Sequence, residues 1–119
     1  MKPKISIIIR TKNEERWILK CLDQIKKQTF KGYEIILVDN NSTDKTVEKA
    51  RLVGVKKIYL IDNFLPGKAL NLGIKKSLGD YIVCLSAHCI PTNKNWLKNL
   101  IKNFELENNV AGVYGRQEP

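Results

Sequence analysis

The sequence contains few cysteines and no long apolar run. Its 119 residues include three cysteines, none of them in a Cys-x-x-Cys pair, so neither a disulfide framework nor a structural zinc site is predicted. The sequence has no secretory signal and no apolar stretch of about 18 residues, the length that indicates a membrane-spanning helix. We therefore expect a soluble, cytoplasmic chain whose thiols are reduced and mostly buried.

Glycine-rich phosphate-binding loops are also missing. The first apolar run, Ile5–Ile9, leads into the segment RTKNEE, and without a glycine this segment cannot form the usual dinucleotide-binding turn. Residues 66–69 imitate the end of a P-loop, but the position five residues before Gly67 is Asp62. Lys68 is followed by alanine, which has no hydroxyl for magnesium. Both common phosphate loops are therefore excluded.

Positive charge is in excess, with 21 Lys and Arg against 12 Asp and Glu and a net charge of +9. This balance favours anionic ligands such as nucleotides and diphosphates, or an acidic membrane surface. A compositional bias toward Lys, Asn and Ile would produce the same excess. The lysines are scattered over every predicted helix, and no zinc-finger, RNA-binding or basic-zipper pattern accompanies them. We therefore expect no nucleic-acid partner.

Short apolar runs alternate with helix-like patterns along the chain. Four runs rich in Ile, Val and Tyr stop at polar segments and predict strands: Ile5–Ile9, Ile35–Val38, Lys57–Ile61 and Tyr81–Leu85. Apolar residues at helical spacing predict helices at about Glu14–Gln28, Thr43–Val53, Pro66–Leu78 and Trp96–Phe104. In the third helix, Leu70, Ile74 and Leu78 are expected on the inner face. A last run, Val110–Tyr114, is expected to form a fifth strand.

Strands separated by helices of this length need crossover connections, which are right-handed in nearly all cases. The predicted fold is therefore α/β, a three-layer Rossmann-like arrangement with a mainly parallel sheet and helices on both faces. The length suits one domain. Because nothing after the last apolar run would cover that edge of the sheet, we expect the chain to be part of a larger protein.

Polar residues gather where the predicted strands end, and open α/β sheets bind their ligands at the carboxyl ends of their strands. Asp39 ends the most apolar run and is expected to face a crevice, while Ser42, Thr43 and Asp44 can cap the following helix. As an alternative, Asp39 only caps a turn. The whole set of candidate residues comprises Thr11, Asn13, Glu14, Asp39, Ser42, Lys68, Asn71, Ser86 and His88.

Four segments of the chain resemble the motifs of glycosyltransferase family 2. The chain reads SIIIRTKNEE, VDNNSTD, GKALNLG and LSAHCIP, where the family has SIIIPTYNEE-like, VDDGSTD-like, K-ALN-G and L-D-A-D-D-x-P segments. The match runs in the correct order from about Ile5 to Pro91. The resemblance implies a GT-A type fold, with residues 1–119 as the nucleotide-sugar-binding domain at the N-terminal end of a larger transferase.

The resemblance also implies roles for the candidate residues. Asp39 would accept a hydrogen bond from the nucleotide base, and Thr11 and Glu14 would line the base and ribose pocket. Lys68 would hold the diphosphate as a compact positive charge. Alternatively, Glu14 only begins the first helix, because a carboxylate at a helix N-terminus interacts favourably with the helix dipole. For Lys68, the alternative is an ordinary solvent-exposed lysine with no ligand. The remaining implied substrate-binding residues are Asn13, Ser42, Asn71 and Ser86, of which Asn71 fits a packing role equally well.

The chain departs from the family at the D-x-D pattern, whose carboxylates meet the ribose and a divalent cation that bridges the diphosphate. Ser86 and His88 fill the two aspartate positions here. A cation is still implied, either manganese or magnesium, with His88 as its candidate ligand. Neutral imidazole suits manganese or another transition ion, whereas magnesium prefers oxygen. As alternatives, His88 donates a hydrogen bond to the diphosphate without a metal, or it is structural.

The implied reaction is inverting transfer of a sugar from a UDP, GDP or dTDP type donor to a saccharide or lipid-linked acceptor, as in polysaccharide biosynthesis. No catalytic residue is assigned within the chain, since the general base is expected in a later segment. A peripheral association with the inner face of the membrane is also compatible with the sequence.

Two other functions are alternatives. One is a noncatalytic nucleotide-sugar binding module, which the loss of the D-x-D carboxylates favours. The other is a flavodoxin-like signalling or interaction domain, but Arg10, Thr11 and Lys12 fit the first strand end of such a domain poorly.

Overall fold

The computed structural model describes residues 2–62, 66–87, 90–91 and 93–106, without the side chains of Pro66 and residues 103–106. Its elements follow one another as β1 Ile5–Thr11, α1 Ile18–Lys26, β2 Tyr33–Asp39, α2 Thr46–Leu52, β3 Lys57–Leu60, α3 Pro66–Lys76, β4 Tyr81–Ser86 and α4 Trp96–Leu106. The four strands form a sheet in the order β3-β2-β1-β4. All neighbouring pairs are parallel, which confirms the predicted α/β fold class.

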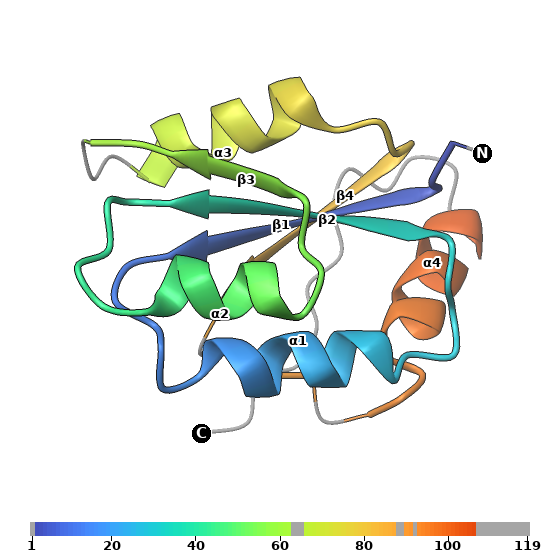
Figure 1. The fold of residues 1–119 in the computed structure, drawn as a ribbon. Helices are drawn as coiled ribbons and strands as arrows, with labels where there is room; N and C mark the ends of the chain where they lie inside the picture. The colour runs from blue at the N-terminus through green and yellow to red at the C-terminus, as the bar shows by residue number, and fades with distance from the viewer. Residues whose placement is uncertain (1, 63–65, 88–89, 92, 107–119) are drawn as a thin grey trace.

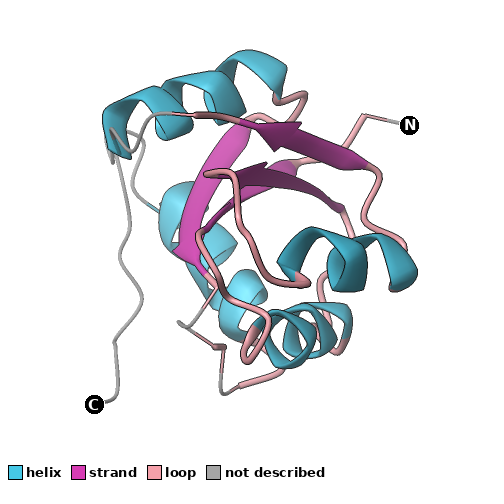
Figure 2. Ribbon diagram, turned by 60° about the vertical axis from the view of Figure 1, so that its left-hand side comes forward, coloured by secondary structure: helices cyan, strands magenta, loops and turns pink. Residues whose placement is uncertain are grey.

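The helices lie on both faces of the sheet, as predicted. Helix α3 covers one face, and α1 and α2 cover the other (Figure 1). The sheet twists between these two layers (Figure 2). The arrowheads of β1, β2 and β3 point to the same side in Figure 1, so the loops that follow these strands meet at one edge of the sheet.

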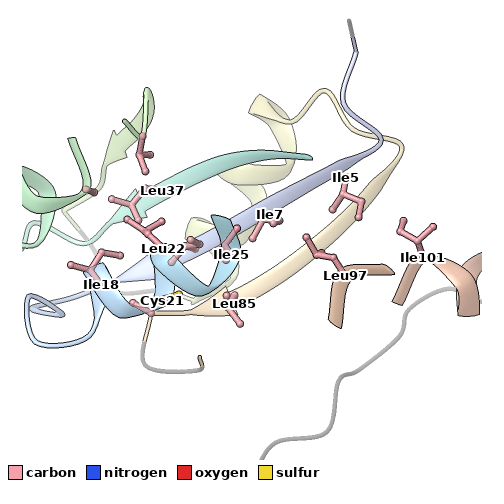
Figure 3. Packing of buried hydrophobic residues seen from close by; sticks show 14 residues of the cluster. Ile5, Ile7, Ile18, Cys21, Leu22, Ile25, Leu37, Leu85, Leu97 and Ile101 are labelled. Atoms are coloured by element: carbon pink, nitrogen blue, oxygen red, sulfur yellow. The ribbon is translucent and has the colours of Figure 1, made fainter. Parts of the chain in front are cut away.

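The larger core lies between the sheet and helices α1, α2 and α4. Alternate residues of β1 point into it: Ile9 is completely buried there, as are Ile5 and Ile7 (Figure 3). They pack against Leu22 and Ile25 of α1 (Figure 3). Burying one such side chain contributes about 1.5–3 kcal/mol. This packing fixes the positions of the strands and therefore of the loops at their carboxyl ends.

The smaller core lies under α3 and contains the other side chains of the same strands. Ile8, Ile36 and Val38 are buried there with Ala69 of α3. The helix lies very close to β1, because a Cβ added at Gly73 would be only 2.6 Å from Cγ2 of Ile8. A glycine is therefore required where the helix crosses the strand.

Two helices begin later than the sequence predicted. Helix α1 begins at Ile18 rather than Glu14, because residues 14–17 form a turn in which the Glu14 carbonyl accepts hydrogen bonds from the amides of Trp17 and Ile18, each at 2.9 Å. Helix α2 begins at Thr46 rather than Thr43. In both places, side chains from the facing segment accept hydrogen bonds from backbone amides of the residues before the helix.

Two predictions of burial were wrong. Ile74 and Leu78 are 45% and 56% exposed, whereas Ala69 and Gly73 lie against the sheet. Cys84 is exposed, because it lies on the α3 face of β4, which is at one end of the described sheet and makes few contacts with α3. Cys21 is buried as expected. The predicted strand at 110–114 lies outside the described residues. No helix in the described part of the chain is long and apolar enough to cross a membrane.

Candidate functional site

The carboxylate of Asp39 is the centre of a buried hydrogen-bonded cluster at the carboxyl ends of β1 and β2. The register places Thr11 directly beside Asp39, and the Thr11 hydroxyl donates to Oδ1 at 2.6 Å. Ser42 donates twice, from its amide to Oδ2 at 2.8 Å and from its hydroxyl to Oδ1 at 2.6 Å. Asp39 is only 1% exposed. Its carboxylate can accept about four hydrogen bonds, so these three leave room for about one more.

Hydrogen bonds of Asn13 and Ser42 join the loop after β1 to the loop after β2. The amide of Asn13 donates to the Ser42 hydroxyl at 2.8 Å, and the side-chain oxygen of Asn13 accepts from the Thr43 amide at 2.8 Å. Asn13 and Asn41 have φ angles of 52° and 50°, a left-handed conformation that asparagine tolerates better than most residues. The two loops therefore form one rigid unit around Asp39.

A second set of bonds joins the start of α1 to the start of α2. The Glu14 amide donates to the Thr46 hydroxyl at 2.8 Å, and the Glu15 amide donates to Asp44 Oδ2 at 3.1 Å. Asp44 also accepts from the Thr46 amide at 3.0 Å. Burial acts to raise the pKa of Asp44, but the bonds from Thr46 and Glu15 together lower the pKa below its usual value. Glu14 thus helps to join the two helix starts through its backbone amide, and its side chain is half-buried.

The remaining candidates lie farther from this cluster. Lys68 and Asn71 are exposed on the first turns of α3, and among the described residues no hydrogen bond joins them to Asp39. Ser86 ends β4, is half-buried and lies beside Arg10 of β1. The structure therefore brings Thr11, Asn13, Asp39 and Ser42 into contact, while His88 lies outside the described residues.

Arg10 is a polar residue at this edge that the predicted set left out. Its Nε is buried and has no hydrogen-bond partner. Arg10 lies beside β4 in the register of the sheet. Although Cys84 of β4 is exposed as a residue, partial desolvation by its neighbours raises the pKa of its thiol, and the positive charge of Arg10 acts in the opposite direction. The sequence carried a signal for it, because arginine stands in SIIIRTKNEE where the family motif has proline.

The described residues alone do not form a metal centre. Within that part of the chain, no group of three His, Cys, Asp or Glu side chains could hold an ion. Two carboxylates near the strand ends, Asp39 and Asp44, already accept hydrogen bonds from protein groups. A cation would therefore need ligands from elsewhere, such as His88 or the oxygens of a bound diphosphate.

Comparisons with known proteins agree with the motifs. Residues 6–118 match the sequence profile described as Glycosyl transferase family 2. A dolichyl N-acetyl-alpha-D-glucosaminyl phosphate 3-beta-D-2,3-diacetamido-2,3-dideoxy-beta-D-glucuronosyltransferase from Methanococcus voltae is 37% identical over 123 aligned residues. The alignment covers 93% of this chain but only 38% of that relative.

Two solved structures have a similar fold. S. aureus TarS, residues 1–349, superposes with a TM-score of 0.76 at 29% identity, covering 98% of this chain and 38% of that one. TarS has been solved in complex with UDP and with UDP-GlcNAc. The mannosyltransferase PcManGT from Pyrobaculum calidifontis, in complex with GDP-Man and Mn²⁺, also gives 0.76 at 25% identity, covering 87% of this chain and 33% of that one. The chain therefore belongs to glycosyl transferase family 2.

Proposed function

We propose that this chain is the donor-binding half of a glycosyltransferase and holds a nucleotide diphosphate sugar at the carboxyl edge of its sheet. The observation that carries the proposal is the cluster of Thr11, Asp39 and Ser42 at the ends of β1 and β2. Support also comes from two structural neighbours, solved with UDP-GlcNAc and with GDP-Man. The chain spans 38% of its M. voltae relative, so the activity of a whole enzyme is part of the proposal.

In this proposal the two interlocked loops bind the base and ribose. Asp39 uses its remaining acceptor capacity for a base N–H, and Thr11 and Ser42 hold the carboxylate in the orientation that this contact needs. A carboxylate held in advance loses little conformational freedom when the ligand binds. Glu14 and Asn13 complete this pocket.

The diphosphate then extends toward β4 and α3. Ser86 offers a hydroxyl to it, while Lys68 offers a charge and Asn71 an amide from the exposed first turns of α3. For the cation, we propose that His88 and the diphosphate oxygens bind manganese together, so that the ion binds better with nucleotide than alone. Imidazole must be neutral to ligate, so this cooperative binding should fade below about pH 6.5.

The proposed reaction is an in-line displacement at the anomeric carbon. The bond from that carbon to the β-phosphate oxygen breaks, and the nucleoside diphosphate leaves with the electron pair. The acceptor hydroxyl oxygen forms the new bond from the opposite side, which inverts the centre, and its proton passes to a general base. We place the base and the saccharide or lipid-linked acceptor outside these 119 residues. The net charge of +9 supports a location at the anionic cytoplasmic face of a membrane.

Nucleotide binding can be tested by thermal shift and calorimetry with UDP, GDP, CMP and dTDP sugars, each with manganese and with chelator. We expect one donor class to raise the melting temperature. Lys68→Gln should weaken its binding up to about fivefold, since an exposed charge contributes up to about 1 kcal/mol. Lys98→Gln, which removes an exposed lysine from α4, is the matched control.

If no nucleotide shifts the melting temperature, the proposal is wrong. A separate incubation with labelled donor and a range of acceptors should show no transfer by the 119-residue chain, and robust turnover would contradict the assignment of the base to a later segment. Donor binding without transfer by a longer form of the protein would favour the noncatalytic module, which the replacement of both D-x-D carboxylates by Ser86 and His88 also suggests.

A further inference from the structure

Arg10 lies where the diphosphate of a bound donor would be expected. The side chains of β1 alternate between the two faces of the sheet, so Thr11 points toward the larger core and Arg10 toward the α3 face. On that face its neighbours are Val38 of β2 and Ser86 of β4. Neighbouring strands are about 4.8 Å apart. The side chain of Arg10 therefore leaves the sheet beside that of Ser86, one of the residues predicted to contact the diphosphate.

The hydrogen bonding of Arg10 is incomplete within the described residues. Its Nε is buried without a partner, and among those residues no carboxylate forms an ion pair with it. The Arg10 residue is only partly buried, but a buried donor that has lost its water without gaining an acceptor is unfavourable. This arrangement is expected if an anionic ligand supplies the missing acceptor.

The sequence at the end of β4 indicates which anion this is. Where the family has an aspartate that helps to bring a cation to the diphosphate, this chain has the neutral Ser86 with a cationic arginine beside it. A guanidinium is always charged, and its planar fork matches two phosphate oxygens at once. It can therefore neutralise phosphate charge directly, without a metal ion.

We propose that Arg10 binds the diphosphate of the nucleotide-sugar donor directly, from the α3 face of the sheet, and so supplies charge neutralisation that does not depend on a divalent cation. This inference rests on the proposed function, because it assigns a further residue to the same donor site. Arg10 also stabilises the charge that develops on the leaving nucleoside diphosphate. The cation proposed at His88 would add to this effect.

The experiment compares wild type, Arg10→Gln and Arg51→Gln in EDTA. Arg51 is an exposed arginine of α2, on the opposite face of the sheet, and is the matched control. UDP and GDP are titrated by calorimetry, and uridine and guanosine by NMR. Arg10→Gln should weaken the binding of the preferred diphosphate about tenfold or more, as expected for charge-assisted hydrogen bonds. Nucleoside affinity should stay within about twofold, and Arg51→Gln should behave as wild type.

The outcomes separate the two proposals. If wild type binds neither UDP nor GDP, the proposed function itself is overturned. If wild type binds one of them in EDTA and Arg10→Gln binds it equally well, only the assignment of Arg10 is overturned. A loss of nucleoside affinity equal to the loss of diphosphate affinity would also overturn it, because the variant would then have damaged the pocket as a whole.

A second measurement needs no variant and so does not depend on the folding of Arg10→Gln. Cys84 is exposed, lies on the same face of β4 as Ser86 and is close enough to Arg10 to sense its charge. Saturating UDP or GDP should slow alkylation of Cys84 by iodoacetamide at least threefold, as measured by peptide mapping, whereas the nucleoside should not. Equal rates with and without saturating diphosphate would contradict the proposed contact.

Discussion

Replacing Asp39 removes the acceptor of three buried hydrogen bonds, so we predict a loss of stability as well as of nucleotide binding. Thr11 donates one of these bonds and Ser42 donates two. Bonds to a charged group contribute about 1.5–3 kcal/mol each, and part of this is regained when water reaches the exposed donors. We therefore expect Asp39→Ala to lower the free energy of unfolding by about 3 kcal/mol.

Asp39→Asn should cost less, because the hydroxyls of Thr11 and Ser42 can rotate and accept from the new amide group, while the amide oxygen still accepts from the Ser42 amide. Only the charge assistance is lost, which we expect to cost about 1.5 kcal/mol. For a domain of about 120 residues, 1 kcal/mol corresponds to about 4 °C in Tm. The expected decreases are therefore about 12 °C for alanine and about 6 °C for asparagine.

Thermal unfolding followed by circular dichroism measures both values. The matched control is Asp23→Ala, which removes an exposed carboxylate paired with Lys27 at 3.0 Å on α1 and should change Tm by about 2 °C or less. If Asp39→Ala melts within 2 °C of Asp23→Ala, the buried cluster does not stabilise the loops. If folded Asp39→Asn retains the nucleotide affinity of wild type, Asp39 does not belong to the donor site.

Three other variants test the packing and electrostatics of the sheet. Burial acts to raise the pKa of Glu34, but bonds from Lys57, Ser6 and the Leu78 amide lower the pKa below its usual value. The ionised Glu34 therefore stabilises the fold above about pH 4.3, and this contribution is lost as the pH falls through the folded-state pKa. Urea unfolding at pH 7 and pH 3 should show this pH-dependent contribution in wild type but not in Glu34→Gln. Gly73→Ala should destabilise by about 2 kcal/mol in the same assay because a Cβ there would be 2.6 Å from a side-chain carbon of β1, whereas Gly67→Ala, which meets nothing within 4 Å, should not. The charge of Arg10 lowers the pKa of Cys84 against the larger effect of burial, so Arg10→Gln should slow alkylation of that thiol at pH 8; an unchanged rate would contradict their proximity.

The strands and their parallel pairing could be predicted because the information is local, whereas their order in the sheet was not predicted. A continuous run such as Ile5–Ile9 indicates a strand buried on both faces, and helices between such runs require parallel crossovers. The ends of these runs also placed Asp39 and Thr11 among the polar residues expected at the carboxyl edge of the sheet, and the structure shows that the two residues are direct neighbours. The resemblance to a known family then linked this edge to nucleotide-sugar binding.

The errors came from contacts between distant segments. Helix α1 begins late because residues 14–17 form a separate turn, whose first amide donates to Thr46 of the next helix, and helical spacing cannot reveal such contacts. Apolar spacing also assigned Ile74 to the inner face of α3, whereas the close approach of the helix to β1 requires Gly73 there. Likewise, Cys84 is exposed because α3 packs on β1 and β2 and makes few contacts with β4, and the sequence of β4 alone does not show this.

Two adjacent residues at the end of β1 connect the proposed base and diphosphate sites. Because strand side chains alternate, Thr11 reaches Asp39 on one face while Arg10 reaches the side of Ser86 on the other. An aspartate at position 86 would lie one strand spacing from Arg10 and would pair with it, since opposite unit charges about 5 Å apart attract by about 3 kcal/mol at an effective dielectric constant of about 20. That pair would neutralise the guanidinium and weaken its hold on a phosphate. The serine in place of the first D-x-D aspartate and the arginine in place of the motif's proline are therefore consistent with each other: the first change leaves the charge introduced by the second available to the donor.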